Sequence, residues 1–184
     1  MRTLRKTIIG ALAALGIAGA AQAADVDYEM AAALSGLYVR GDIGASILDW
    51  SGGKDDTAFA FGAGLGYRFN PYLRADVRYT RAGKYKVGGG TDLTASSVLG
   101  NIYFDLPVNN WPLRPYLGAG LGYGWAKFSP GADDDGLAAA FMAGFSASLT
   151  PNLVMDAGYR FHDIMVNGPD VIDHQLLIGL RYRF

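Results

Sequence analysis

The sequence of 184 residues contains no cysteine and has few charged residues. Without cysteine the chain cannot form disulfides, thiolate metal sites, a cysteine nucleophile or a lipid-anchored N-terminal cysteine. Charged residues make up 18% of the chain, below the roughly 25% usual for soluble domains. The formal net charge is −1, and this lack of a basic excess argues against nucleic-acid binding.

Long apolar runs are also missing from most of the chain. After Ala23 no uninterrupted apolar run is long enough to form a membrane helix. The mean hydropathy of +0.13 is far below that of a helical membrane bundle, and it is too high for a charged linker. The length leaves room for one domain.

The N-terminal residues have the features of a secretory signal. Arg2, Arg5 and Lys6 precede an uncharged apolar stretch at 7–20, and residues 21–23 fit the small-x-small cleavage rule. We therefore expect residues 1–23 to be a cleavable signal peptide; the alternative is an uncleaved membrane anchor. The mature chain would then hold 13 basic and 17 acidic residues, a net charge of 13 − 17 = −4. Export leads to the periplasm, the outer membrane or the medium.

Glycine and a two-residue alternation are what the chain has in abundance. It contains 26 glycines, and after a periplasmic lead at 24–36 apolar residues recur at every second position, which is the period of a β-strand. Eight such segments occur, at 37–47, 59–69, 73–80, 97–106, 116–125, 137–149, 153–162 and 175–184. Most hold about ten residues, the length of a tilted transmembrane strand, whereas strands of soluble proteins average roughly 5–6.

The connections between these segments alternate as well. Proline-containing turns follow the second, fourth and sixth segments, whereas longer polar stretches at 49–56, 81–92, 129–136 and 163–173 follow the other segments. With both termini in the periplasm, the short turns would lie inside and the longer loops outside. Outer-membrane β-barrels have this arrangement.

The distribution of charge decides which face of the strands points to lipid. One face is almost free of charge, and the other carries Arg40, Asp42, Arg68, Arg74, Asp76, Arg78, Asp105, Asp156, Arg160, Arg181 and Arg183. An Arg or Lys facing lipid costs roughly 2–4 kcal/mol at mid-bilayer, so eleven such charges would exceed a folding stability of about 5–15 kcal/mol. In a soluble barrel the many glycines on this face would leave voids, because glycine has no side chain to pack. The sequence therefore predicts an all-β, eight-stranded antiparallel up-and-down transmembrane β-barrel over 37–184, with the charges enclosed.

Three segments resemble the small OmpA-like, opacity-type outer-membrane β-barrel family, also called the porin family. They are the opening strand at 36–44, the Pro-Tyr-x-Gly-x-Gly-x-Gly pattern at 115–123 and the phenylalanine-ended segment 180–184. The resemblance implies an outer-membrane location, lipid and lipopolysaccharide as surroundings, a monomer, and insertion by the barrel assembly machinery after delivery by periplasmic chaperones. The assembly signal would be Leu176, Ile178, Leu180, Tyr182 and Phe184. We do not expect the peptidoglycan-binding domain of full-length OmpA-type proteins.

An eight-stranded barrel is just wide enough to hold its own side chains, and buried charges are tolerated only when they are paired. We therefore expect a charge network inside the barrel that comprises Arg40, Asp42, Arg74, Asp76, Arg78, Asp105, Asp156, Arg160 and Arg181. In this hypothesis Asp42, Asp76, Asp105 and Asp156 offset Arg40, Arg74, Arg78 and Arg160 and close the lumen. The corresponding role is structural, in envelope integrity; a narrow ion-conducting porin is an alternative.

The outer side offers further surfaces for function. Arg81, Lys84 and Lys86 make the second outer loop basic and are possible lipopolysaccharide contacts, although ordinary solvated charge explains them too. Residues 133–135 are three aspartates, which we interpret as a solvated turn rather than a cation site, because no glycine-bearing ligand loop accompanies them. Aromatic residues, among them Tyr85, Trp125 and Phe128, are expected at the outer rim. A surface adhesin that acts through the four outer loops is a second alternative.

An enzymatic function has little support in the sequence. Some small outer-membrane barrels are lipid A deacylases or acyltransferases, which need a Ser-His-acid arrangement. The chain has only His162 and His174, and neither has a hydroxyl nucleophile beside it. The deacylase-like His-x-Ser pattern is absent because Ile164 stands two residues after His162. The glycines alternate along strands and do not precede a helix, so no phosphate loop is expected. We therefore predict no catalytic, cofactor or metal site.

Overall fold

The computed structural model describes residues 35–49, 56–88, 90–108, 111–129, 131, 133–165 and 171–184. The predicted signal peptide at 1–23 and almost all of the lead at 24–36 lie outside the described residues. Within the described part, no helix is long and apolar enough to cross a membrane.

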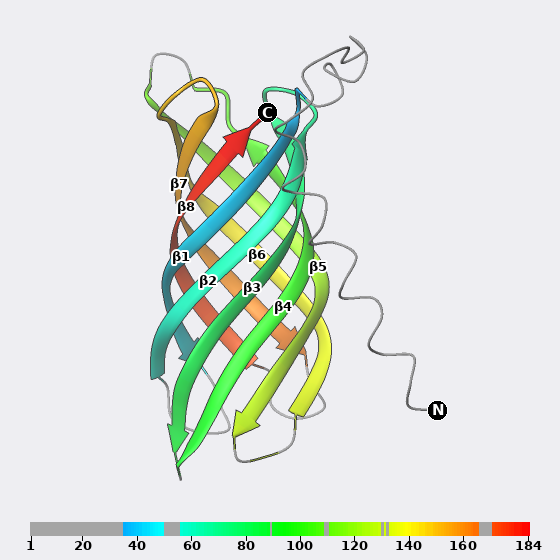
Figure 1. Ribbon diagram of the computed structural model, residues 1–184, viewed down its shortest axis with the longest axis vertical. Helices are drawn as coiled ribbons and strands as arrows, with labels where there is room; N and C mark the ends of the chain where they lie inside the picture. The colour runs from blue at the N-terminus through cyan, green and yellow to red at the C-terminus, as the bar shows by residue number, and fades with distance from the viewer. Residues whose placement is uncertain are drawn as a thin grey trace, which may run out of the picture. The chain divides into compact units, whose positions relative to one another are not determined.

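Eight antiparallel strands form one closed barrel (Figure 1). The strands are β1 (Leu37–Asp49), β2 (Asp56–Arg68), β3 (Leu73–Gly88), β4 (Thr91–Asp105), β5 (Leu113–Ser129), β6 (Asp133–Ser148), β7 (Leu153–Met165) and β8 (Val171–Arg183). Each strand pairs with its neighbours in the chain, and β8 pairs with β1, from Tyr38 opposite Arg183 to Asp49 opposite Ile172. The predicted fold is confirmed. Closure leaves no strand edge whose N–H and C=O groups lipid would have to satisfy.

The two faces of the strands are those that the alternation predicts. Large apolar side chains point outward; Leu121 and Phe141 are each 64% exposed. The residues between them point into the barrel, where Arg40, Arg74 and Asp76 are buried. Apolar side chains thus meet the lipid along the strands and the ionised ones are enclosed.

The strands are longer than the alternation indicates. They hold 13–17 residues instead of about ten, and β3 to β6 are the longest. We call the end at which β1 begins and β8 ends the terminal end, and the opposite one the far end. The connections at the far end are residues 50–55, 89–90, 130–132 and 166–170, and those at the terminal end are 69–72, 106–112 and 149–152. The expectation of longer outer loops is therefore wrong. Polar residues continue the strand ladders beyond the apolar belt, because backbone pairing needs no apolar side chain.

Residues assigned to loops from the sequence accordingly lie on strands. Arg81, Lys84 and Lys86 belong to β3, the three aspartates at 133–135 begin β6, and Asp173 belongs to β8. At this end Lys127 and Asp133 form an exposed ion pair with 3.8 Å between Nζ and Oδ2.

A bulge in β3 changes the alternation near the far end. The register with β4 shifts between Gly83 and Tyr85, and Gly83 has a φ of 118°, a conformation that favours glycine. After the bulge Lys84 is exposed and Tyr85 is fully buried in the lumen. The prediction of Tyr85 at the outer rim is therefore wrong. Phe128, predicted at the same rim, is partly buried against the interior apolar residues.

The turns between β2 and β3 and between β6 and β7 are built alike. Asn70 Oδ1 accepts the backbone N–H of Leu73 at 2.8 Å, and Thr150 Oγ1 accepts that of Leu153 at 3.0 Å. These side chains replace backbone partners in the manner of Asx and Ser/Thr turns. Pro71 follows Asn70, and Pro151 follows Thr150. Two turns on opposite sides of the barrel therefore have the same construction at the terminal end.

The outward face can be tested with one charge at two depths. We expect Leu121→Arg, in the middle of β5, to lower the free energy of unfolding by about 2–4 kcal/mol, because the guanidinium would face hydrocarbon. The matched control Leu113→Arg, at the terminal end of the same strand, should cost roughly 0–1 kcal/mol because it lies near the interface. Urea unfolding in lipid vesicles measures both. Equal losses at the two depths would contradict this orientation.

Candidate functional site

Among the described residues, ten charged side chains of balanced sign are buried in the barrel interior. Five arginines (Arg40, Arg74, Arg78, Arg160 and Arg181) and five aspartates (Asp42, Asp76, Asp105, Asp156 and Asp173) are buried. Asp173 was not among the residues predicted from the sequence. Its inward position follows from β8 beginning at Val171, because alternation back from Gln175 places residue 173 on the same face.

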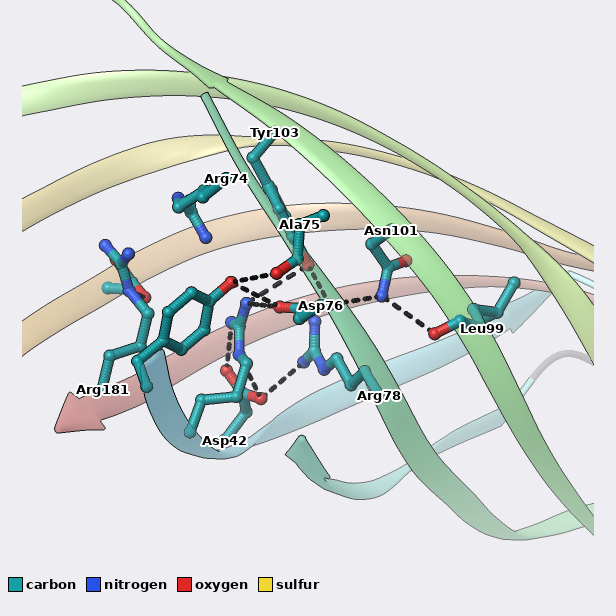
Figure 2. Close-up of polar contacts among 12 residues, drawn as sticks. Asp42, Arg74, Ala75, Asp76, Arg78, Leu99, Asn101, Tyr103 and Arg181 are labelled. Atoms are coloured by element: carbon teal, nitrogen blue, oxygen red, sulfur yellow. Dashed lines mark hydrogen bonds and ion pairs between the residues drawn. The ribbon is translucent and has the colours of Figure 1, made fainter. Parts of the chain in front are cut away.

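Asp76 of β3 is the most highly connected carboxylate of the interior (Figure 2). Its Oδ2 accepts hydrogen bonds from Arg40 Nη1 at 3.0 Å and from the Tyr38 hydroxyl at 3.2 Å. Its Oδ1 accepts them from Asn101 Nδ2 at 2.7 Å and from the Tyr103 hydroxyl at 3.4 Å. Donors from β1 and β4 thus meet on one side chain, so a single carboxylate joins three strands.

Arg40 connects Asp76 to a second carboxylate on its own strand. Its Nη2 donates to Asp42 Oδ1 at 2.7 Å and its Nε to Oδ2 at 3.3 Å, and the two residues share a face because they are two positions apart. Arg78 Nη2 lies 3.0 Å from Asp42 Oδ2 in a further ion pair. Asp42 is therefore shared by two arginines, and Arg40 by two aspartates.

Two more ion pairs lie toward the terminal end. Arg181 binds Asp156 with both Nε and Nη2, at 2.6 Å and 2.9 Å. This two-pronged geometry is the strong form of an arginine–carboxylate pair. Arg74 Nε lies 3.1 Å from Asp105 Oδ1, and its guanidinium carbon stacks 4.0 Å from the ring centre of Tyr103.

The structure brings most, but not all, of the predicted pairs together. Arg40, Arg74 and Arg78 each contact an aspartate of the predicted set, whereas Arg160 Nη1 donates to Thr80 Oγ1 at 2.6 Å. Within the described residues no carboxylate forms an ion pair with Arg160. Asp156 stands four positions along the same strand, about 13 Å away at the rise of an extended chain, and it is already bound by Arg181.

Inward glycines provide the space for these side chains. A Cβ at Gly62 would come within 3.2 Å of Arg78 Nε, and one at Gly64 within 3.4 Å of Arg40 Cγ. A Cβ at Gly179 would overlap the carboxylate of Asp42. The narrow lumen accommodates these long charged side chains because the neighbouring strands carry glycine, which has no side chain, at the inward positions beside them.

Toward the far end buried apolar side chains become more frequent, alongside the buried polar residues Ser46, His162, Asp173 and Gln175. The largest buried apolar group there comprises Leu48, Ala60, Ala82, Tyr85, Leu93, Ala95, Leu99, Ala126, Ala138, Ile164, Val171 and Leu177. Between this group and the ion pairs, the space around Arg40, Asp42, Arg78 and Arg160 amounts to about 10 Å³. Such a volume holds about one water molecule. The described side chains therefore leave little space in this middle part of the lumen.

The closed barrel, its apolar outer face and its enclosed charges agree with comparisons to known proteins. Residues 10–184 match the family described as "Outer membrane protein beta-barrel domain". The chain belongs to this family. Membership places it in the outer membrane.

Individual relatives support this assignment. A protein of Brucella abortus (strain 2308), itself uncharacterized, is 33% identical over 204 residues, covering 74% of this chain and 70% of the relative. The crystal structure of Neisserial surface protein A is similar with a TM-score of 0.73 and 31% identity, covering 82% of this chain and 98% of that one. Ail, the attachment invasion locus protein of Yersinia pestis, has a TM-score of 0.55 at 22% identity and covers 80% and 99%; this likeness shows the fold alone.

In this outer-membrane barrel the histidines are not arranged as in a catalytic triad. His162 Nδ1 lies 2.6 Å from Asp173 Oδ1, but the Ser46 hydroxyl donates to Asp173 rather than to the imidazole. These three side chains are at most 2% exposed. His174 points outward, and its Nδ1 contacts the Tyr159 hydroxyl. Alternation alone could not reveal the Ser46–Asp173 contact, because the two residues come from strands at opposite ends of the chain.

The remaining predicted residues point away from the lumen. The proposed assembly residues Leu176, Ile178, Leu180, Tyr182 and Phe184 are all exposed along β8 and at its end. Arg81, Lys84 and Lys86 are exposed at the far end of β3. Near them Tyr79 and Trp125 stack with 6.2 Å between ring centres. Basic and aromatic side chains thus lie together on the outer surface.

Removal of the Asp76 charge tests the interior network. Asp76→Asn should lower the free energy of unfolding by about 3–5 kcal/mol, because Arg40 would lose one of its two buried carboxylates. The control Asp133→Asn breaks the exposed pair with Lys127 and should cost less than about 1 kcal/mol. Denaturant unfolding in vesicles compares the two variants with the wild type. If the two losses are alike, Asp76 does not hold the interior together.

Proposed function

We propose that this outer-membrane barrel is a structural component of the cell envelope that supports its integrity and does not conduct ions. The filled lumen is the observation that carries this proposal. Among the described residues, five arginines and five aspartates are buried, and the space around Arg40, Asp42, Arg78 and Arg160 amounts to about 10 Å³. A plugged barrel adds a rigid, lipid-anchored element to the membrane without opening it.

The apolar group toward the far end argues against the alternative of a narrow porin. Water-filled barrels have polar lumens, whereas Leu48, Leu93 and Ile164 lie fully buried in the far half of this one. A hydrated ion would have to pass both this apolar group and the ion pairs. Opening a path would require several strands to release their inward side chains together.

Planar-bilayer recordings test the closed lumen. The purified wild-type protein should show no steady conductance, because neither half of the interior offers a hydrated path. The double variant Arg40→Ala/Arg181→Ala removes two large side chains and should increase brief openings; Leu121→Ala, on the lipid face, serves as its control. A large, stable open channel formed by the wild-type protein would refute the plugged interior.

We also propose that the terminal end faces the periplasm and that residues 1–23 are removed on export. The greater extension of β3 to β6 at the far end supports this orientation (Figure 1), because outer-membrane barrels extend farther on the outside than in the periplasm. The exposed series of β8, which ends in Phe184, then supplies the signal to the barrel assembly machinery, with periplasmic chaperones upstream. The protein would act as a monomer.

The outer rim suggests a contact with lipopolysaccharide. In this orientation the exposed Arg81, Lys84 and Lys86 of β3 lie at the level of the outer leaflet, beside the stacked Tyr79 and Trp125. Cationic side chains pair well with phosphate oxygens, and aromatic rings favour the interface. We propose that these three side chains bind lipopolysaccharide phosphates and couple the barrel to its surroundings.

We infer that the protein has no enzymatic activity. The arrangement nearest to a triad joins His162, Asp173 and Ser46, but it is buried, and the Ser46 hydroxyl is bonded to the acid. A general base must reach the proton that it abstracts, and here no substrate has access to the imidazole.

A deletion strain tests the envelope role. Loss of the gene should raise sensitivity to detergent and to large antibiotics, and plasmid-borne wild-type protein should restore resistance. The variant R81Q/K84Q/K86Q should restore it only in part, because its lipopolysaccharide contacts are weakened. Unchanged sensitivity in the deletion strain would contradict the envelope role. If that strain instead loses attachment to host cells, the alternative of a surface adhesin that acts through the outer loops would be favoured.

A further inference from the structure

An unneutralised group of arginines surrounds the terminal mouth of the barrel. The terminal mouth is the cavity of about 560 Å³ at the terminal end. It is lined by Arg68, Asn70, Pro71, Asp105, Val108, Trp111, Pro112, Arg114, Ser146, Ser148, Val154, Arg181 and Arg183. Its volume lies within the roughly 300–1,000 Å³ of ligand pockets. The two charged residues at its floor are already engaged, since Asp105 pairs with Arg74 and Arg181 with Asp156.

Three arginines at the rim have no acidic partner. Arg68 ends β2, Arg114 lies at the start of β5 and Arg183 ends β8. Among the described residues, no carboxylate forms an ion pair with any of the three. Because five arginines and five aspartates balance deeper in the barrel, the described side chains carry three positive charges at this mouth without an ion-pair partner.

Backbone carbonyls hold these guanidinium groups in place without neutralising them. Arg68 Nη2 donates to the Pro71 carbonyl at 2.9 Å, and Arg183 Nη2 donates to the Pro151 carbonyl at 2.7 Å. Pro71 and Pro151 occupy the matching positions of the two similar turns. Arg114 Nη1 reaches the Pro71 carbonyl as well, at 3.4 Å. Arginines of β2 and β5 thus both bind the turn between β2 and β3. The hydrogen bonds to carbonyl groups orient the three guanidinium groups before a ligand binds.

Several guanidinium donors remain unused at this mouth. Each guanidinium offers five N–H donors, and the carbonyls take only one or two from each. Arg183 Nε is buried and has no hydrogen-bond partner among the described residues. A buried donor without a partner is costly, and an anion in the mouth would supply one. Asp105, the nearest carboxylate of the lining, is bound to Arg74 and cannot fill this role.

We infer that the terminal mouth binds a phosphate-bearing anion through Arg68, Arg114 and Arg183. Guanidinium groups match phosphate oxygens with pairs of parallel hydrogen bonds. Outward aromatic residues, including Phe69, Tyr72 and Phe184, are exposed at the same end and mark the level of lipid headgroups. The ligand is therefore either the phosphodiester of an anionic phospholipid headgroup or a free phosphate. This site is independent of the structural role proposed above.

Isothermal titration of the folded protein in a non-ionic detergent tests the inference. The probes are inorganic phosphate, glycerol 3-phosphate and dihexanoyl phosphatidylglycerol, at low ionic strength. We expect saturable binding of at least one probe, with a Kd raised roughly ten-fold or more in R68Q/R114Q/R183Q, because each substitution removes charge-assisted bonds. The variant K127Q removes an exposed positive charge at the opposite end and should change Kd less than about two-fold.

The pattern of binding identifies the source of the phosphate. Binding of the lipid alone indicates a headgroup, and binding of inorganic phosphate with equal or higher affinity indicates a soluble anion. The inference is wrong if no probe binds saturably, or if K127Q loses as much affinity as R68Q/R114Q/R183Q. Heat-modifiable gel mobility verifies that the variants are folded. If R68Q/R114Q/R183Q does not fold, the single substitution Arg114→Gln at an exposed position must still raise Kd measurably.

Discussion

Charged side chains inside the barrel depend on one another, and much of the structure follows from that dependence. Lipid excludes them from the outer face, and the narrow lumen leaves them almost no water. A buried charge left unpaired costs several kcal/mol, so each guanidinium needs an acceptor from another strand. Asp76 of β3 accepts hydrogen bonds from Arg40 of β1 and from Asn101 of β4. Asp156 of β7 accepts one from Arg181 of β8. The same contacts that satisfy the charges therefore tie neighbouring strands together.

Glycine and the far-end apolar group complete this arrangement. Gly62, Gly64 and Gly179 have no side chain where Arg78, Arg40 and Asp42 need space. Farther along the axis, small residues such as Ala95 and Ala126 belong to the same buried apolar group as larger ones such as Leu93 and Ile164. The interior therefore changes along its length from a network of ion pairs to an apolar group that lies beside the buried Asp173–His162 contact. This division supports the proposal of a closed, structural barrel.

The terminal mouth departs from the neutrality of the interior. Four of the five buried arginines described deeper in the barrel pair with aspartates, whereas Arg68, Arg114 and Arg183 are held by carbonyl groups of two similar turns. Carbonyls orient a guanidinium without cancelling its charge. The far end shows a different pattern, with basic side chains on the outer surface of β3 and the exposed Lys127–Asp133 pair. The two ends of the barrel thus present positive charge to different surroundings, one inside the mouth and the other toward the membrane.

The two-residue period of the sequence divided the side chains between two faces of each strand. The cost of placing charge in hydrocarbon determined which of these faces meets lipid. Both follow from local order and solvation, so the sequence by itself was sufficient for this part of the fold. Strand length was different: β3 continues through Arg81, Lys84 and Lys86 because the ladder with β4 extends past the apolar belt, and the bulge at Gly83 turned Tyr85 inward. Partners were also decided only by tertiary structure. Arg160 meets Thr80 rather than an aspartate, and Asp173 joins Ser46 and His162, because closure of β8 on β1 and the register around the barrel bring together residues that no local pattern relates.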